Sequence, residues 1–218
     1  MNKRKVLLSI FLSLFISSLT QAQSFELQSA QQAFQAQQYY RVVSITENIL
    51  KRDSLNLPAY RLLASSQLAQ QQPVEAEKTA GKGLRYFPEQ PALQWIKAES
   101  LLQQGLPDDA LPLYEQLLNS NTSFSEEAIR QRIGIIYQTK GGRYYQDEKL
   151  DLAERNLKKS KQFLPDTLAS YSNLALVYMK KEERRKALEV IDEGRKRFSE
   201  NPSLNSNASQ RVVSNPEL

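Results

Sequence analysis

The stretch LLQQGLPDDALPLYEQLL, residues 101–118, has the features of a helix, a sharp turn and a second helix. Gly105 can adopt the left-handed backbone that ends many helices. Pro107 suits the first turn of the next helix, where its missing N–H costs nothing. The acidic pair 108–109 favours a helix start, because carboxylates interact well with the positive end of the helix dipole. Ala110 is then a small residue at which two helices can approach closely, and the fold depends on whether this pattern recurs.

Small residues recur along the chain at a nearly fixed interval. One series follows the position of Ala110, with intervals of 34, 43 and 34 residues, and consists of Ala76, Ala110, Ala153 and Ala187. A second series lies in the preceding helical runs, with intervals of 34, 36 and 41 residues, and consists of Ala64, Ala98, Gly134 and Ala175. Both series require a two-residue insertion near residues 119–123 and a seven-residue insertion between Gly134 and Ala153. A fixed period with consistent insertions indicates an array of structural repeats.

These residues resemble the tetratricopeptide repeat family, whose 34-residue helix pair carries aromatic and small residues at set positions. The best match consists of Tyr171, Leu174, Ala175, Tyr178, Ala187, Ile191 and Gly194. The weakest match is the first repeat, where Val42 or Val43 stands in place of alanine. The resemblance implies an all-α, right-handed α-solenoid of about five helix–turn–helix repeats. The expected repeats cover residues 24–56, 57–90, 91–125, 126–167 and 168–200.

The two ends of the chain differ from the repeat region 23–200. Residues 1–22 have a basic start, MNKRK, an apolar run, VLLSIFLSLFISSL, and a short polar end, TQA. This order is typical of a secretory signal peptide cleaved after Ala22, with an uncleaved membrane anchor as the alternative. We therefore expect an exported protein, periplasmic or secreted, with no membrane span after cleavage. The tail 201–218 is polar and has no apolar stripe, which predicts disorder.

Cleavage would also change the charge of the chain. The formal net charge is +5, and loss of the three basic residues of the leader would leave about +2. A nearly neutral chain gives no reason to expect a nucleic-acid partner. The basic runs 158–161 and 180–186 alternate with acids or are expected to face solvent. A solvated face is the expected role of these runs, and a patch for an acidic partner is the alternative.

Catalytic and metal-binding groups are scarce. The sequence contains no cysteine and no histidine, which excludes disulfides, a thiol nucleophile, and the commonest general base and transition-metal ligand. The GKG triplet 81–83 lacks phosphate-loop spacing, and Gly83 falls in a small-residue position of the repeat. The acidic pairs 108–109 and 126–127 are expected to open helices rather than to form a hydrolase site. We therefore expect no enzyme activity, no cofactor and no metal site.

The resemblance implies that the first helix of each pair lines a concave groove that binds a partner. Carried over to this sequence, the groove positions are Arg61, Ser65, Leu68, Trp95, Glu99, Leu102, Gln103, Gln131, Ile135, Gln138, Ser172, Leu176 and Met179. The first repeat would add Gln28, Gln32 and Gln35. Trp95, the only tryptophan, is expected to be the central anchor, because aromatic side chains often dominate binding energy; the alternative is that it packs in the core.

The expected function is a non-catalytic scaffold in the cell envelope that binds a peptide or a partner protein in this groove. A structural or assembly subunit that forms homo-oligomers through its helical ends is the alternative. An enzyme or cell-wall-active protein is a third class. The insertion at 141–150, which contains GGRYYQDEK, predicts that both helices of the fourth repeat are one turn longer, or else a protruding binding loop.

Overall fold

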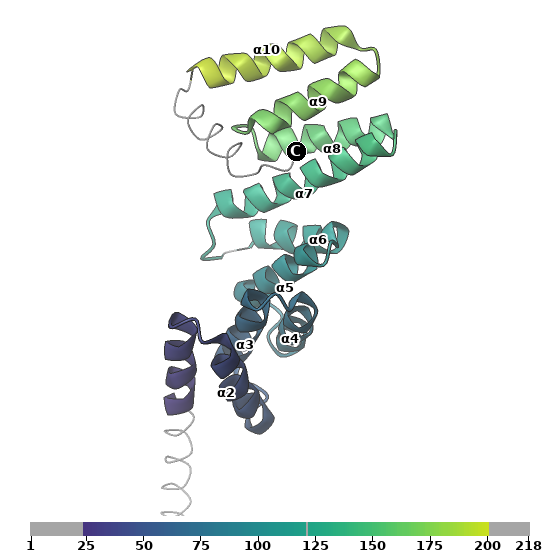
Figure 1. Cartoon of the computed structure of the whole chain (residues 1–218). Helices are drawn as coiled ribbons and strands as arrows, with labels where there is room; N and C mark the ends of the chain where they lie inside the picture. Colours follow the sequence, from purple (N-terminus) through teal and green to yellow (C-terminus); the bar gives the residue numbers. More distant parts are fainter. Residues whose placement is uncertain (1–23, 121, 201–218) are drawn as a thin grey trace, which may run out of the picture. The chain divides into compact units, whose positions relative to one another are not determined.

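The computed structural model describes residues 24–120 and 122–200, and every regular element in these ranges is an α-helix. The first described helix covers residues 24–35. The others are α2 Tyr39–Arg52, α3 Leu57–Ala69, α4 Pro73–Tyr86, α5 Pro91–Gln103, α6 Pro107–Leu118, α7 Glu126–Gln146, α8 Leu150–Phe163, α9 Leu168–Lys180 and α10 Arg184–Glu200 (Figure 1). The predicted all-α repeat architecture is confirmed. The predicted signal peptide 1–22 and tail 201–218 lie outside the described residues.

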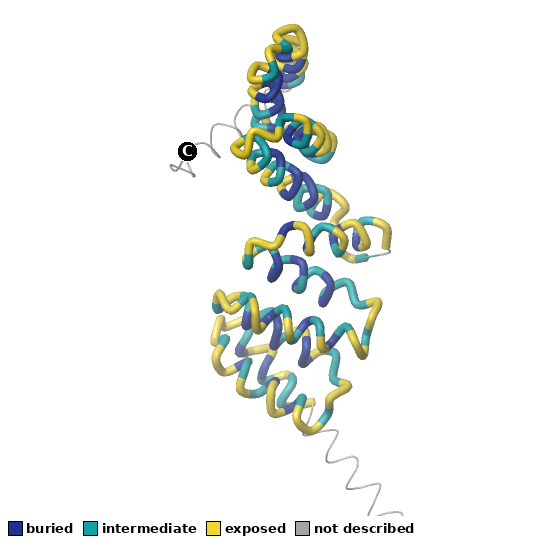
Figure 2. The backbone as a smooth tube through the Cα atoms, turned by 90° about the vertical axis from the view of Figure 1, so that its right-hand side faces the viewer, coloured by how far each residue is buried: buried dark blue, intermediate teal, exposed yellow. Residues whose placement is uncertain are grey.

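The helices form two compact parts. The first extends to Leu113 and the second begins at Tyr114, so the division falls within α6. In the first part α3 packs on α2, α4 and α5; in the second, α8 packs on α7 and α9, and α9 packs on α10. These helices therefore pack mainly against their neighbours in the sequence, as expected of a repeat array. Buried residues alternate with exposed ones along each helix, which gives every helix a buried face (Figure 2).

The turn within each described helix pair has the same backbone geometry. One residue takes a positive φ, between 56° and 74°, and these residues are Gln37, Gln71, Gly105, Glu148 and Glu182. The residue after it donates its N–H to the carbonyl oxygen five residues back, at 2.8–2.9 Å. This is the Schellman arrangement, which satisfies carbonyls at a helix end. The left-handed turn predicted at Gly105 is confirmed, and the other four turns adopt it without glycine.

Both series of small residues lie in the core. Ala64, Ala98, Ala76, Ala110, Ala153 and Ala187 are 0% exposed, and Ala175 is 4% exposed. In the first repeat, Val42 is 0% exposed whereas Val43 is half-buried, so Val42 takes the place of the alanine. Gly134 is also buried, and a Cβ at this position would lie 2.4 Å from Leu164 Cγ. The small side chains are therefore required by close helix contacts.

The seven-residue insertion lengthens one helix only. α7 has 21 residues, against 13 in α3, α5 and α9, whereas α8 has 14, as α4 does. The expectation that both helices are longer is wrong for α8, and no protruding loop forms at 141–146. Gly141 explains this, because a Cβ there would lie 2.5 Å from Leu157 Cγ, so glycine lets the added turns pack on α8. Tyr144 and Tyr145 of these turns are half-buried against the adjoining core.

Candidate functional site

The predicted groove residues occupy one face of the first helix in each pair. Arg61, Ser65 and Leu68 of α3 follow one another at intervals of four and three residues, so they share a face. Their equivalents on α5, 34 residues later, are Trp95, Glu99 and Leu102, and those on α9 are Ser172, Leu176 and Met179. The face therefore repeats from one helix pair to the next.

None of the predicted groove residues is buried. The exposed ones are Arg61, Gln103, Ile135, Ser172, Leu176 and Met179. The half-buried ones are Ser65, Leu68, Trp95, Glu99, Leu102, Gln131 and Gln138. Gln28, Gln32 and Gln35 of the first helix are exposed as well. These positions are accessible to a partner, and the prediction that they bind one stays a prediction.

A hollow on this face brings two of the predicted residues together. It has a volume of about 230 Å³ and is lined by Gln31, Phe34, Pro58, Arg61, Leu62 and Ser65. The helix over 24–35 contributes an amide and an aromatic ring, and α3 contributes a guanidinium, a hydroxyl and apolar side chains. Arg61 is exposed and, among the described residues, forms no ion pair. The hollow therefore offers an unpaired cation beside apolar surface.

The sequence predicted two of the six residues around this hollow and missed the other four, Gln31, Phe34, Pro58 and Leu62. The resemblance pointed to exposed positions on first helices, so it identified Arg61 and Ser65 but not Phe34 or Leu62. Phe34 and Leu62 are half-buried and pack against the small core of the first repeat. Their apolar character was visible in the sequence, but an apolar residue on a helix is usually assigned to the core. Only the packing of α3 against the first helix shows that they also line a hollow.

Trp95 lies between the core and the surface. It is half-buried on α5, whereas its sequence neighbours Gln94 and Ile96 are 5% and 8% exposed. Gln94 is the repeat equivalent of the buried Tyr60, so a glutamine stands at the usual aromatic position of this repeat. Its side-chain amide donates a hydrogen bond to the Pro88 carbonyl oxygen at 3.2 Å. The glutamine thus occupies the interior position, which leaves the tryptophan one residue further around the helix.

The second part carries apolar side chains at its groove positions. Ile135 of α7 is 39% exposed, and Leu176 and Met179 of α9 are each 53% exposed. Leu176 is the repeat equivalent of Ser65 and Met179 that of Leu68. The groove positions of the first part thus include the cation Arg61, and those of the second include the exposed apolar side chains Ile135, Leu176 and Met179.

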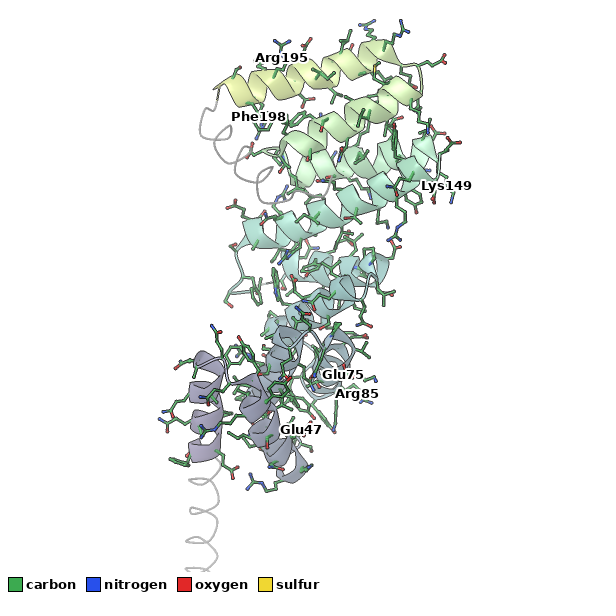
Figure 3. The ribbon with its side chains drawn as sticks, viewed as in Figure 1. Glu47, Glu75, Arg85, Lys149, Arg195 and Phe198 are labelled. Atoms are coloured by element: carbon green, nitrogen blue, oxygen red, sulfur yellow. The ribbon has the colours of Figure 1, made fainter. Side chains whose placement is uncertain are left out.

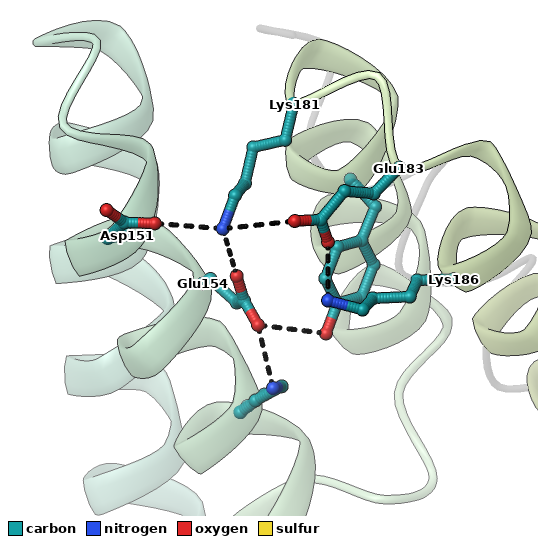
Figure 4. A network of polar contacts seen from close by, with 7 residues as sticks. Asp151, Glu154, Lys181, Glu183 and Lys186 are labelled. Carbon is teal, nitrogen blue, oxygen red and sulfur yellow. Dashed lines mark hydrogen bonds and ion pairs between the residues drawn. The ribbon is translucent and has the colours of Figure 1, made fainter.

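The basic runs do not form a free positive face. Lys181 Nζ lies 2.8 Å from Asp151 Oδ1 and 2.5 Å from Glu154 Oε2, and its side chain is only 17% exposed. Lys158 Nζ lies 2.7 Å from Glu154 Oε1, and Lys161 pairs with Glu193. Figure 4 shows the contacts around Glu154 and Lys181, which also include Tyr178, Glu183 and Lys186. Lys158, Lys161 and Lys181 are thus paired with acidic side chains, while Lys158, Lys159, Lys180 and Lys186 remain exposed, in line with the expected solvated face.

Glu154 has an altered proton affinity within this network. Burial by itself would raise the pKa of the Glu154 carboxyl, but hydrogen bonds from Lys158 and Lys181, together with their charges, lower it to about 2. Tyr178 Oη adds a hydrogen bond to Glu154 Oε1 at 3.2 Å. Because the folded chain favours the charged carboxylate, this network ties part of the stability of the α8–α9 joint to pH.

Acidification is expected to weaken this joint. The pKa of Glu154 falls from about 4.5 to about 2 on folding, so its contribution is complete above pH 4.5 and is lost as the pH falls towards 2. We expect Glu154→Gln to remove on the order of 1 kcal/mol of pH-dependent stability, since Lys158 is half exposed and solvent screens its charge. Thermal unfolding at a series of pH values measures this. Glu189→Gln, on an exposed carboxylate of α10, is the control, and an equal effect there would contradict the prediction.

Two further features bear on the class of protein. In the part of the chain that the structure describes, no three His, Cys, Asp or Glu side chains are grouped so that they could hold a metal ion. Over the same residues, none of the helices is long and apolar enough to cross a membrane.

The fold and these faces define a helical-repeat protein built from helix pairs. Residues 61–126 match the tetratricopeptide repeat family. No curated protein sequence matches the chain. The family match lies within the region 24–200, where the sequence predicts the repeats.

Among solved structures, the chain is similar to the MamA protein, with 14% identity, a TM-score of 0.61, and coverage of 83% of this chain and 94% of that one. It is also similar to YrrB, with 21% identity, a TM-score of 0.58, and coverage of 85% and 90%. YrrB is described as a TPR protein with an unusual peptide-binding site. At these identities the likeness establishes the fold.

Proposed function

We propose that this chain is an exported, non-catalytic interaction module that binds peptide segments of partner proteins along the exposed face of its first helices. The observation that carries the proposal is the hollow around Arg61, Ser65 and Phe34, which offers a cation, hydroxyl and amide groups beside apolar surface. A peptide supplies the complementary groups, namely a carboxylate, backbone N–H and C=O groups, and an apolar side chain.

The chemistry of the hollow favours a partner segment with an acidic side chain. An arginine can hold a carboxylate through two parallel hydrogen bonds, which gives both strength and orientation. Phe34, Pro58 and Leu62 beside it would contact an apolar side chain next to the acidic one. Such a pair of adjacent residues is the recognition element that we assign to the first part of the chain.

The structural neighbour YrrB gives independent support of a general kind, because it is a protein of the same fold to which a peptide-binding site is attributed. The export of this chain is supported by its sequence, since residues 1–22 have the order of a secretory signal peptide. The proposed place of action is therefore the periplasm or the extracellular space. Mass spectrometry of the protein from its native envelope would test this, because cleavage gives an N-terminus near Gln23 and an anchor leaves Met1.

Selection of peptides tests the binding proposal directly. A random peptide library is selected on the purified chain, and the dissociation constants of the enriched peptides are measured by fluorescence anisotropy. We expect the enriched peptides to carry Asp or Glu beside an apolar residue. Arg61→Glu should weaken their binding by about tenfold, or about 1.4 kcal/mol, because it replaces the attraction by repulsion.

Lys78→Glu is the matched control, because it makes the same charge change at an exposed position on the second helix of the same pair. We expect it to leave binding within about twofold of the wild type, with the small change due to net charge. Equal losses in the two variants would show that binding follows net charge rather than the hollow. Enriched peptides without acidic residues would contradict the role given to Arg61.

A further inference from the structure

The C-terminal end of the second part has a hollow that the described residues leave open. It has a volume of about 660 Å³ and lies between α9 and α10. Its lining includes Leu168, Tyr171, Ile191, Gly194 and Phe198. Leu168 and Ile191 are 52% and 40% exposed, so much of this surface is apolar and accessible. Phe198 and Arg195 lie on the last turns of α10 (Figure 3), and the Phe198 ring meets the Tyr171 ring edge-on at 6.1 Å.

The first part contains an equivalent site, beside Gly83 and Tyr60, and there another side chain fills it. Gly83 follows Tyr60 by 23 residues, as Gly194 follows Tyr171, and both glycines are buried. A Cβ at Gly83 would lie 3.1 Å from Tyr60 Cγ, and one at Gly194 would lie 3.0 Å from Tyr171 Cγ. The two glycine–tyrosine contacts are therefore equivalent in sequence and in space.

The occupant of the filled site is the start of the next helix. A Cβ at Gly83 would lie 2.7 Å from Leu93 Cδ1, so the Leu93 side chain sits directly on this glycine. Leu93 is the third residue of α5 and is 0% exposed. At Gly194, by contrast, the three nearest atoms all belong to Tyr171. The third position of the first helix is buried in other repeats too, since Ala59 and Ser170 are each 0% exposed.

The sequence beyond α10 repeats the sequence that fills the first site. Phe87, Pro91 and Leu93 follow Gly83 by four, eight and ten residues. Phe198, Pro202 and Leu204 follow Gly194 by the same intervals. Pro91 is the first residue of α5, where proline is well suited to a helix start. Residues 202 and 204 lie beyond the described part of the chain, so this comparison rests on their sequence alone.

We propose that the chain's own segment 202–204 fills the open hollow between α9 and α10, with Leu204 seated against Gly194 and Tyr171 as Leu93 is seated against Gly83 and Tyr60. The short connection favours this occupant over a second copy of the chain, because a tethered segment is present at a high effective concentration. Docking of the segment would be driven by burial of the Leu204 side chain and of the ring surfaces of Tyr171 and Phe198. The proposal does not depend on the proposed peptide-binding function.

The segment would then close the end of the array. An uncovered end of a helical repeat array exposes apolar surface and invites contact with other molecules. With Leu204 in place, the chain covers this end itself, and the α9–α10 end would not serve as a site of homo-oligomer contact. Partner binding would be left to the faces of the first helices.

Cross-linking tests where residue 204 lies, because the chain has no cysteine of its own. Leu168→Cys and Leu204→Cys are introduced together in the full chain and treated with a short thiol-reactive cross-linker. Leu57, the repeat equivalent of Leu168, packs against the core cluster that contains Leu93, so residues 168 and 204 should be close. The control pair is Leu188→Cys with Leu204→Cys, since Leu188 is 60% exposed on α10 and does not line the hollow.

We expect the 168–204 pair to give an intrachain product at least several times faster than the 188–204 pair. Equal rates for the two pairs would overturn the proposal. A product that joins two chains would also overturn it, because a second copy of the chain would then be the occupant. Peptide mapping after proteolysis distinguishes the intrachain product from the interchain one.

A second measurement does not depend on cysteine chemistry. Leu204→Asp places a charge in the proposed apolar site, and Leu218→Asp makes the same change at the last residue. We expect Leu204→Asp to speed amide hydrogen exchange in residues 191–199 by about tenfold, since loss of a packed side chain favours local opening. Leu218→Asp should leave this exchange unchanged. Identical exchange in the two variants would show that Leu204 does not cover α10.

Discussion

Ala110→Leu is expected to lower the free energy of unfolding by about 1–3 kcal/mol, because it forces three additional heavy atoms into a filled helix contact. Ala110 is 0% exposed, and its counterpart in the preceding helix, Ala98, is 0% exposed as well. Interiors at normal packing density have no room for a larger side chain without shifts of the backbone. Urea unfolding followed by circular dichroism measures the loss, which should appear as a lower midpoint.

Gln116→Leu is the matched control for this substitution. It adds a leucine to the same helix, α6, at an exposed position, so it should change the stability by no more than about 0.5 kcal/mol. If Ala110→Leu unfolds at the same urea concentration as the wild type, the helices around Ala110 are not closely packed. The repeat register built on the alanine series would then have to be revised.

Trp95→Ala is expected to weaken peptide binding by about 30-fold, which corresponds to about 2 kcal/mol. Trp95 is half-buried and takes the place in its repeat that Arg61 takes in the previous one. Part of the ring is therefore held by the protein while the rest is accessible, and such a pre-ordered aromatic group loses little entropy on binding. Anisotropy titrations with the peptides selected on the wild-type chain measure the change.

Circular dichroism of Trp95→Ala separates loss of binding from loss of structure. The helical signal should be largely retained, since the interior position beside Trp95 is filled by Gln94. Unfolding of the variant, with unchanged binding by the folded fraction, would contradict the groove assignment. Trp95 would then belong to the core, and the binding surface would have to be sought near Tyr144 and Tyr145 or at the C-terminal end.

Only part of the candidate site could be predicted from the sequence. Spacing within the repeat was enough to select side chains that are not buried, because a helix places residues four and three apart on one face. It could not show that Arg61 stands at a hollow with Phe34, since these residues come from different helices. Spacing along α8 could indicate the Lys158–Glu154 pair, because the two residues are four apart. It could not show that Lys181 meets Glu154 or that Lys161 meets Glu193, because tertiary packing brings these residues together.

The sequence by itself determined the all-helical repeat architecture, because a 34-residue period of alanines and glycines can only be explained by repeated close contacts between helices. It also determined the turn at Gly105, whose backbone conformation is a local property of glycine. Tertiary structure decided whether Val42 or Val43 faces the core, since both residues are equally apolar and only the packing of α2 distinguishes them.

Tertiary structure likewise decided where the insertion goes. Seven extra residues can form a loop, lengthen one helix or lengthen two, and no local preference separates these outcomes. α7 takes all of them, because Gly141 lets its added turns approach Leu157 of α8 and because Tyr144 and Tyr145 then pack on the core. The period of the repeats can be found in the sequence. Contacts between helices decide which of two valines faces the core and which helix takes the inserted residues.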